Sequence, residues 1–113
     1  MSPLEEFTRI TVQVIREDGL DGYLPTILHR ATKVIRAIDG IPEDVEHHDA
    51  IQNVIAHEKL EAEEFFFGVQ TGPKTIITGH HTREGTTFMT IIEANDGYVM
   101  QPLGECPWWR IHP

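Results

Sequence analysis

The chain has 113 residues, of which 40% are hydrophobic and 24% charged, enough for one packed domain over residues 1–113 without disulfides or bound metal. No apolar run approaches the roughly 20 residues of a membrane span, the N-terminus is not typical of a signal peptide, and the single cysteine, Cys106, excludes an internal disulfide. We therefore expect a cytoplasmic protein that does not enter a membrane, and its net charge of −9 argues against binding to phosphate backbones.

Most of the negative charge lies in one stretch in the middle of the chain. Between Glu43 and Glu64 the sequence has eight acidic residues and one basic residue, Lys59, so this stretch supplies 8 − 1 = 7 of the 9 net negative charges. It also separates a half that we expect to be helical, residues 1–60, from a half that we expect to be β-rich, residues 61–113.

The first predicted helix covers Pro3–Asp18. Ser2 before a proline, with Glu5 three residues later, is typical of a capping box, and Gly19 suits a left-handed C-terminal cap. The side chains that we expect to share the buried face are Leu4, Phe7, Ile10, Thr11, Val14 and Ile15. The side chains that point the other way are Arg9, Gln13 and Arg16.

The segment after this helix has two competing interpretations. Tyr23–Pro25 is expected to be extended, because the residue before a proline avoids the α region. A second helix over Thr26–Asp39, ended by Gly40, would place its apolar side chains on one arc. The alternative is a hairpin with strands at Tyr23–Leu28 and Lys33–Ile38, which the β-branched residues favour. We prefer the helix because apolar and polar residues alternate poorly here.

A third helix is predicted over Glu43–Glu58, with acidic residues at its N-terminus, where the helix dipole favours them. Beyond it the apolar periodicity is that of strands separated by short turns. The four predicted strands are Glu64–Gln70, Lys74–Thr82, Thr86–Ala94 and Tyr98–Leu103. Connections this short imply antiparallel neighbours. The predicted fold class is therefore α+β, with three N-terminal helices followed by an antiparallel β meander or hairpins.

The order of these elements resembles that of winged-helix domains. The resemblance covers the first 82 residues and rests on the order and length of five elements: Pro3–Asp18, Tyr23–Pro25, Thr26–Asp39, Glu43–Glu58 and the hairpin Glu64–Thr82. Thr86–Leu103 would be an additional hairpin. The resemblance implies a third helix that reads the DNA major groove and a hairpin that lies along the backbone.

The charge of the third predicted helix does not suit DNA. It carries five acidic residues and no basic residue before Lys59. Winged helices also serve as protein-interaction and dimerisation modules, and this charge pattern fits that role better.

The sequence has no motif that identifies a reaction or a cofactor. Ser2 is the only serine and caps a helix, which argues against serine nucleophile chemistry, and neither phosphate-binding glycine motif occurs. The histidines are the best chemical lead. His47 and Asp44 with His80, or with His81 in its place, could hold a metal ion or line a small-molecule pocket between helices and sheet. We prefer a non-enzymatic protein without a cofactor.

Two groups of basic residues could contact nucleic acid. One lies on the second predicted helix and contains Arg30, Lys33 and Arg36. The other lies in the predicted hairpin and contains Lys74, His80, His81 and Arg83. The first group could instead form salt bridges with the acidic stretch, within the molecule or across a dimer interface.

Three consecutive phenylalanines, Phe65, Phe66 and Phe67, place side chains on both faces of a strand. Each face then needs a packing partner, with helices on one side and a second subunit or the Trp108–Trp109 tail on the other. The expected function is a small binding module with a nucleic-acid-associated or protein-interaction role. The expected partner is another protein or a second copy in a homodimer.

Overall fold

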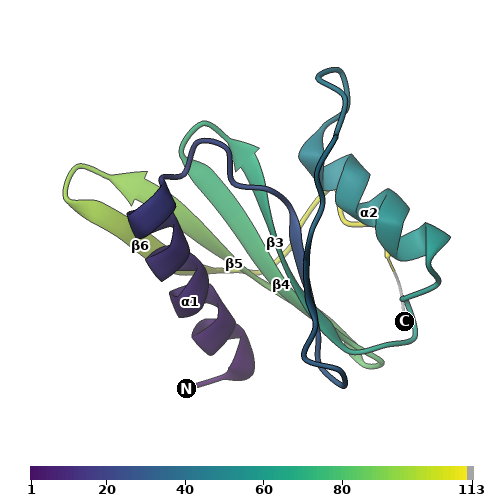
Figure 1. Ribbon diagram of the computed structural model, residues 1–113. Coiled ribbons are helices and arrows are strands. Elements are labelled where there is room, and N and C mark those ends of the chain that lie inside the picture. The colour runs from purple at the N-terminus through teal and green to yellow at the C-terminus, as the bar shows by residue number, and fades with distance from the viewer. Residues whose placement is uncertain (112–113) are drawn as a thin grey trace.

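In the computed structural model, which describes residues 1–111, two helices lie against one six-stranded antiparallel sheet (Figure 1). The helices are α1, Pro3–Asp18, and α2, His47–His57. The strands are β1, Thr26–His29; β2, Ile35–Ala37; β3, Phe65–Gly72; β4, Thr75–Thr82; β5, Gly85–Ala94; and β6, Gly97–Leu103. Their order is β2-β1-β3-β4-β5-β6, so β2 and β6 are the edges. Within the described residues, no helix is long and apolar enough to cross a membrane.

The predicted fold with three N-terminal helices is wrong, because the segment predicted as the second helix forms β1 and β2. Ile27 pairs with Phe67 of β3 and is fully buried, so the hairpin extends the sheet and contributes to its core. Lys33, with φ of 57°, lies in the turn between β1 and β2. Val34 and Ile35, which a helix would have placed on its buried arc, stay exposed. The winged-helix-like arrangement is therefore replaced by a helix, a hairpin, a mid-chain helix and a meander.

The first helix and the four C-terminal strands are confirmed. The Ser2 hydroxyl accepts a hydrogen bond from the Glu5 N–H at 3.1 Å, and Gly19, at φ 85°, ends the helix with its N–H bonded to the Ile15 carbonyl. The buried face of α1 differs from the predicted one, because Thr8 and Val12 are buried while Ile10 and Val14 are exposed. α2 begins at His47, four residues after the predicted start.

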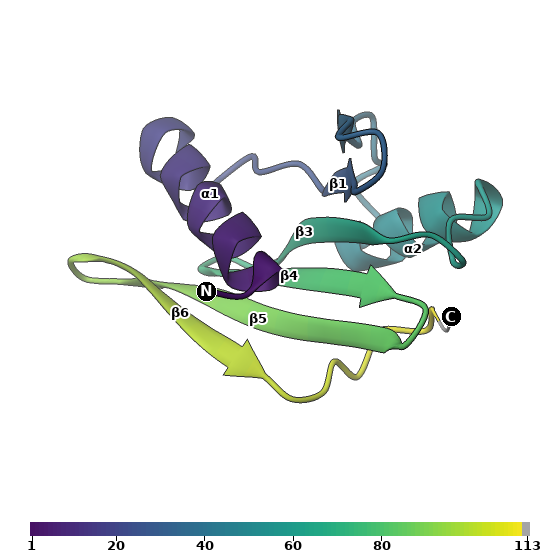
Figure 2. The same cartoon turned by 90° about the horizontal axis from the view of Figure 1, so that it is seen from below.

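The two helices cover opposite faces of the sheet, which gives three layers (Figure 2). Consecutive strand residues point to opposite faces. Ile76 of β4 accordingly packs in a cluster with Val12 and Ile15 of α1. Its neighbour Ile77 packs in the other cluster, which contains Ile51 of α2. We call the side covered by α1 the α1 face and the other side the α2 face.

The segment after β6, residues 104–111, crosses back over the α2 face. Trp109 stacks on Phe67 with ring centroids 4.6 Å apart, so the aromatic tail packs on the sheet, but on the same face as α2 and not, as predicted, on a face without a helix. The buried Gln52 of α2 fixes the tail, since its side chain donates to the Trp108 carbonyl at 2.9 Å and accepts from the Arg110 N–H at 2.6 Å. We call residues 104–111 the tail.

The three phenylalanines find their packing partners within one chain. Phe65 and Phe67 lie on the α2 face, in the cluster that also contains α2 and the tail. Phe66 lies on the α1 face and stacks on Phe7 of α1 at 5.4 Å. Packing of this strand therefore does not require a second subunit, and the homodimer stays a prediction.

Candidate functional site

The residues predicted to bind a metal lie on different layers. His47 is the first residue of α2 and Asp44 precedes that helix, on the α2 side of the sheet. His80 of β4 points to the α1 face, where its ring stacks on Phe66 at 4.3 Å. Among residues 1–111, no three His, Cys, Asp or Glu side chains are grouped so that they could hold a metal ion. The predicted set of ligands is thus not brought together.

His80 and His81 both contact the segment between α2 and β3. His80 Nε2 lies 2.7 Å from a carboxylate oxygen of Glu64 on the α1 face. His81 is fully buried on the α2 face, and its Nε2 lies 2.7 Å from the Glu61 carbonyl oxygen. The two histidines therefore hold one connecting segment from opposite faces of the sheet and do not form a shared site.

The basic residues predicted to contact nucleic acid are dispersed. Arg36 of β2 donates to Glu58 at 2.7 Å, so the predicted pairing of this group with the acidic stretch is present at this position. Arg30 and Lys33 lie in the β1–β2 turn. Lys74 and Arg83 flank the two ends of β4 and are separated by roughly 30 Å of extended chain. With His81 buried, these residues do not form one continuous basic surface.

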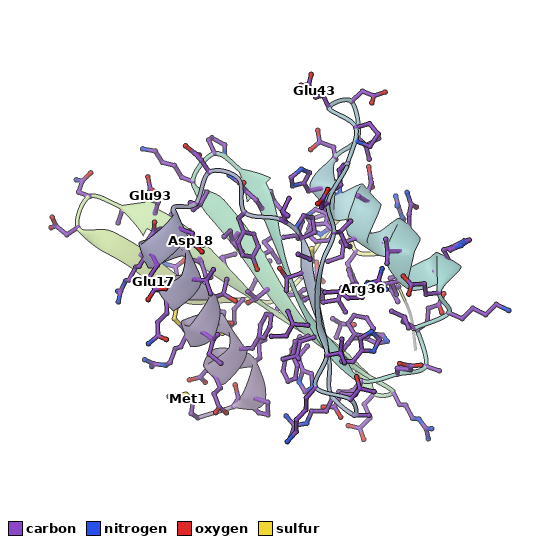
Figure 3. The ribbon with its side chains drawn as sticks, in the orientation of Figure 1. Met1, Glu17, Asp18, Arg36, Glu43 and Glu93 are labelled. Atoms are coloured by element: carbon purple, nitrogen blue, oxygen red, sulfur yellow. The ribbon has the colours of Figure 1, made fainter. Side chains whose placement is uncertain are left out.

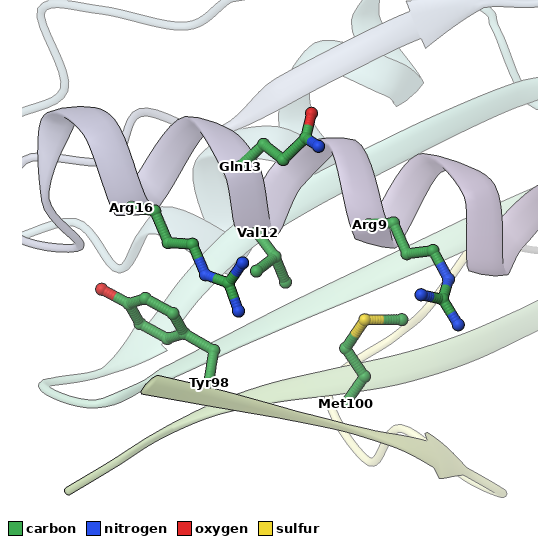
Figure 4. A pocket seen from close by; sticks show the side chains of 6 residues that line it. All are labelled: Arg9, Val12, Gln13, Arg16, Tyr98 and Met100. Atoms are coloured by element: carbon green, nitrogen blue, oxygen red, sulfur yellow. The ribbon is translucent and has the colours of Figure 1, made fainter. Parts of the chain in front are cut away.

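A groove between α1 and β6 is the better candidate site. Its volume is about 320 Å³, and the residues that line it are Arg9, Val12, Gln13, Arg16, Tyr98 and Met100. Figure 4 shows both arginines reaching from α1 toward β6, with Tyr98 and Met100 extending from the strand toward the helix. A second cavity, at the β5–β6 turn, shares Arg16 and Tyr98 and continues the groove along the sheet edge. We call this region the α1–β6 groove.

The two arginines of the groove have no acidic partner. In the described part of the chain, neither Arg9 nor Arg16 forms an ion pair, and among the lysines and arginines only Arg36 and Arg110 pair with carboxylates. Seven residues apart on a helix, Arg9 and Arg16 lie on the same side and about 10 Å apart along the axis. Val12 forms the buried apolar floor between them. The groove therefore presents two uncompensated cations over an apolar floor.

Two other cavities among the described residues lack this combination. The cavity beside the tail contains Arg110, which pairs with Asp49 at 3.3 Å. The cavity at the β4–β5 turn contains Arg83 together with two glutamates, Glu64 and Glu84. Their local charge is therefore compensated or negative, and neither offers an anion a pair of free guanidinium groups.

The sequence predicts the helix side of the groove but not its strand side. The spacing of Arg9, Gln13 and Arg16 correctly places them on the outer side of the first helix. What the sequence does not indicate is that the last strand runs beside this helix, which brings Tyr98 and Met100 opposite the arginines. Comparison with models of protein families, with curated proteins and with solved structures gave no match for this chain.

Proposed function

We propose that the protein is a non-enzymatic binding module that holds an acidic ligand in the α1–β6 groove. The observation that carries the proposal is that two arginines without an ion-pair partner, Arg9 and Arg16, line one groove in a chain of net charge −9. Guanidinium groups form strong, bidentate hydrogen bonds with carboxylates. Two of them above the apolar side chains of Val12 and Met100 suit a ligand with two carboxylates and some apolar surface.

A short acidic segment fits this surface better than a nucleic acid does. Duplex-binding proteins commonly contact about six to ten phosphates, and this groove supplies two cations. Acidic residues also lie near the Arg16 end of the groove, where Glu93 pairs with Tyr98. Figure 3 shows Glu17 and Asp18 at the end of α1, with Glu93 on the neighbouring hairpin. A long polyanion would meet these carboxylates, whereas two carboxylates placed between the arginines would not.

Calorimetric titration with a short glutamate-rich peptide at low salt tests the proposal. The double variant Arg9→Glu/Arg16→Glu should abolish binding, because it replaces both attractive contacts with repulsive ones. The matched control is Arg30→Glu/Lys33→Glu in the β1–β2 turn, which changes the net charge equally, from −9 to −13 in both cases (−9 − 4 = −13). The control should bind as the unaltered chain does. Equal loss in both variants would show that net charge, and not the groove, governs the interaction.

Salt dependence provides a second measurement of the same interaction. Because the contacts are exposed ion pairs, raising the ionic strength from about 0.05 M to 0.5 M should weaken the peptide's affinity markedly. An affinity that does not change with salt would argue that the peptide binds elsewhere by apolar contact.

A further inference from the structure

We propose that the acidic ligand is an extended segment of a partner protein that adds to the sheet as a further strand beside β6. The inference rests on the proposed function and specifies the conformation and the residue pattern of the ligand. It follows from three features of β6: its open backbone groups, the different character of its two faces, and a proline near its end.

The backbone of β6 offers unused hydrogen-bonding groups at its outer edge. The Glu93 N–H bonds to the Lys74 carbonyl at 2.9 Å, so Glu93 of β5 turns its backbone groups away from β6. Its partner Tyr98, directly opposite, must then turn its own backbone groups to the outside. By the same alternation, Met100 also presents an N–H and a carbonyl outward, because strand residues repeat every second position.

These open backbone groups lie directly beside the arginines. Tyr98 and Met100 are the two strand residues that line the α1–β6 groove. A strand paired with them would project alternate side chains to the α1 face, toward Arg9 and Arg16. Acidic residues at these alternate positions would therefore reach the guanidinium groups while the backbone completes the sheet.

The other face of the edge carries exposed apolar side chains. Ile92 of β5 and Val99 of β6 are neighbours in the sheet register and are 37% and 44% exposed on the α2 face. The intervening side chains of an added strand would lie beside Val99, with Ile92 one strand further in. The matching ligand therefore alternates acidic residues on one face with apolar residues on the other, for example glutamate and valine in turn.

Pro102 limits the length of the added strand. It occupies the next outward-facing position after Met100, and a proline has no N–H to donate. Pairing therefore centres on Tyr98 and Met100, the two strand residues that line the groove. The β6 strand of a second copy, Gly97–Leu103, has no acidic residue to offer Arg9 and Arg16, which favours a separate acidic partner over a second copy of this chain as the occupant.

Backbone-methylated peptides test strand addition directly. The probe is a blocked peptide of about seven residues with glutamate and valine alternating, titrated into the full chain by calorimetry. Two derivatives carry N-methyl groups, one on every glutamate nitrogen and the other on every valine nitrogen. In an added strand only one of these sets points toward β6. We expect methylation of that set to weaken binding at least about tenfold and methylation of the other set to change it little.

The methylated peptide that binds more weakly also shows whether the added strand runs parallel or antiparallel to β6. In an antiparallel arrangement, residues opposite Tyr98 and Met100 share their side-chain face, so the glutamate nitrogens point toward β6. In a parallel arrangement the valine nitrogens do. Loss of affinity in one set supports strand addition, and little or equal change in both sets overturns it.

The outcomes separate this inference from the proposed function. If neither methylated peptide differs from the parent while Arg9→Glu/Arg16→Glu still abolishes binding, the groove binds acidic ligands without strand addition. If the parent peptide does not bind at all, the proposed function fails with it. A dimer found by light scattering that neither binds the peptide nor dissociates in its presence would identify a second copy as the occupant and overturn the inference.

Discussion

His81 is fully buried on the α2 face, and its hydrogen-bond partners determine which ring nitrogen bears the hydrogen. Its Nε2 faces the Glu61 carbonyl, which can only accept, so Nε2 bears the hydrogen. Its Nδ1 lies 2.8 Å from the Thr86 hydroxyl, which in turn accepts from the Trp109 indole N–H at 3.1 Å. With the Thr86 hydroxyl donating to Nδ1, every member of this chain has a hydrogen-bond partner.

Replacement of His81 by phenylalanine should destabilise the protein by about 1–3 kcal/mol, because it leaves the Glu61 carbonyl and the Thr86 hydroxyl without their buried partner. Urea unfolding followed by circular dichroism measures this loss. The matched control is His80→Phe, which removes a hydrogen bond to the exposed Glu64 carboxylate and should cost less. Similar losses for both variants would contradict a structural role specific to His81.

Cys106 is buried, and burial raises the pKa of its thiol from 9.0 to about 11. The thiolate is the reactive form. At pH 8 its fraction should fall from about 10% in the unfolded chain to about 0.1% in the folded one. Alkylation by iodoacetamide at pH 8 should accordingly be slow in buffer and fast in urea, and it should accelerate as the pH rises toward 11. Equal rates in the two solvents would mean that the thiol is accessible.

At the scale of elements, local sequence signals predicted α1 and β3–β6 but not β1 and β2. α1 carries its own start and stop residues, Ser2 and Gly19. The last four strands carry their own turns. The hairpin segment has an apolar pattern compatible with either a helix or strands. Its contacts with the rest of the chain decide between these two structures. Pairing of β1 with β3 satisfies the open backbone of β3 and buries Ile27 at once.

The contribution of this tertiary contact is measurable. Ile27→Ala should cost about 2–5 kcal/mol, because it leaves a cavity between Phe67 and α2 at a fully buried position. Ile35→Ala in the neighbouring strand changes a side chain that is 65% exposed and should be close to neutral. Thermal unfolding of the two variants compares them directly. A large loss for the Ile35 variant would show that the outer face of the hairpin is covered in solution.

The difference between local sequence signals and tertiary contacts also explains why only the helix side of the candidate site was predicted. The direction of Arg9 and Arg16 follows from helix periodicity alone, whereas their position opposite Tyr98 depends on how α1 crosses the sheet. That crossing is adjusted by contacts such as the 2.8 Å approach of the Thr8 and Thr78 hydroxyls. This pair buries Thr8 in preference to the more apolar Ile10, which periodicity alone cannot reveal.

At the scale of the whole molecule, the acidic stretch and the α1–β6 groove do not share residues. The stretch forms α2 and its two flanking segments, with Glu43 on the protruding loop that precedes the helix (Figure 3) and Glu64 beside His80 on the α1 face. The stretch that dominates the charge of the sequence therefore contributes no side chain to the candidate site.

The three-layer arrangement also divides the aromatic chromophores of the chain. Both tryptophans, Trp108 and Trp109, lie in the tail and pack with the cluster on the α2 face. Both tyrosines, Tyr23 and Tyr98, pack with the cluster on the α1 face. Tryptophan fluorescence therefore follows docking of the tail on the α2 face. The tyrosines belong to the α1 face, with Tyr98 in the groove and Tyr23 outside it, so each face of the sheet carries its own kind of aromatic chromophore.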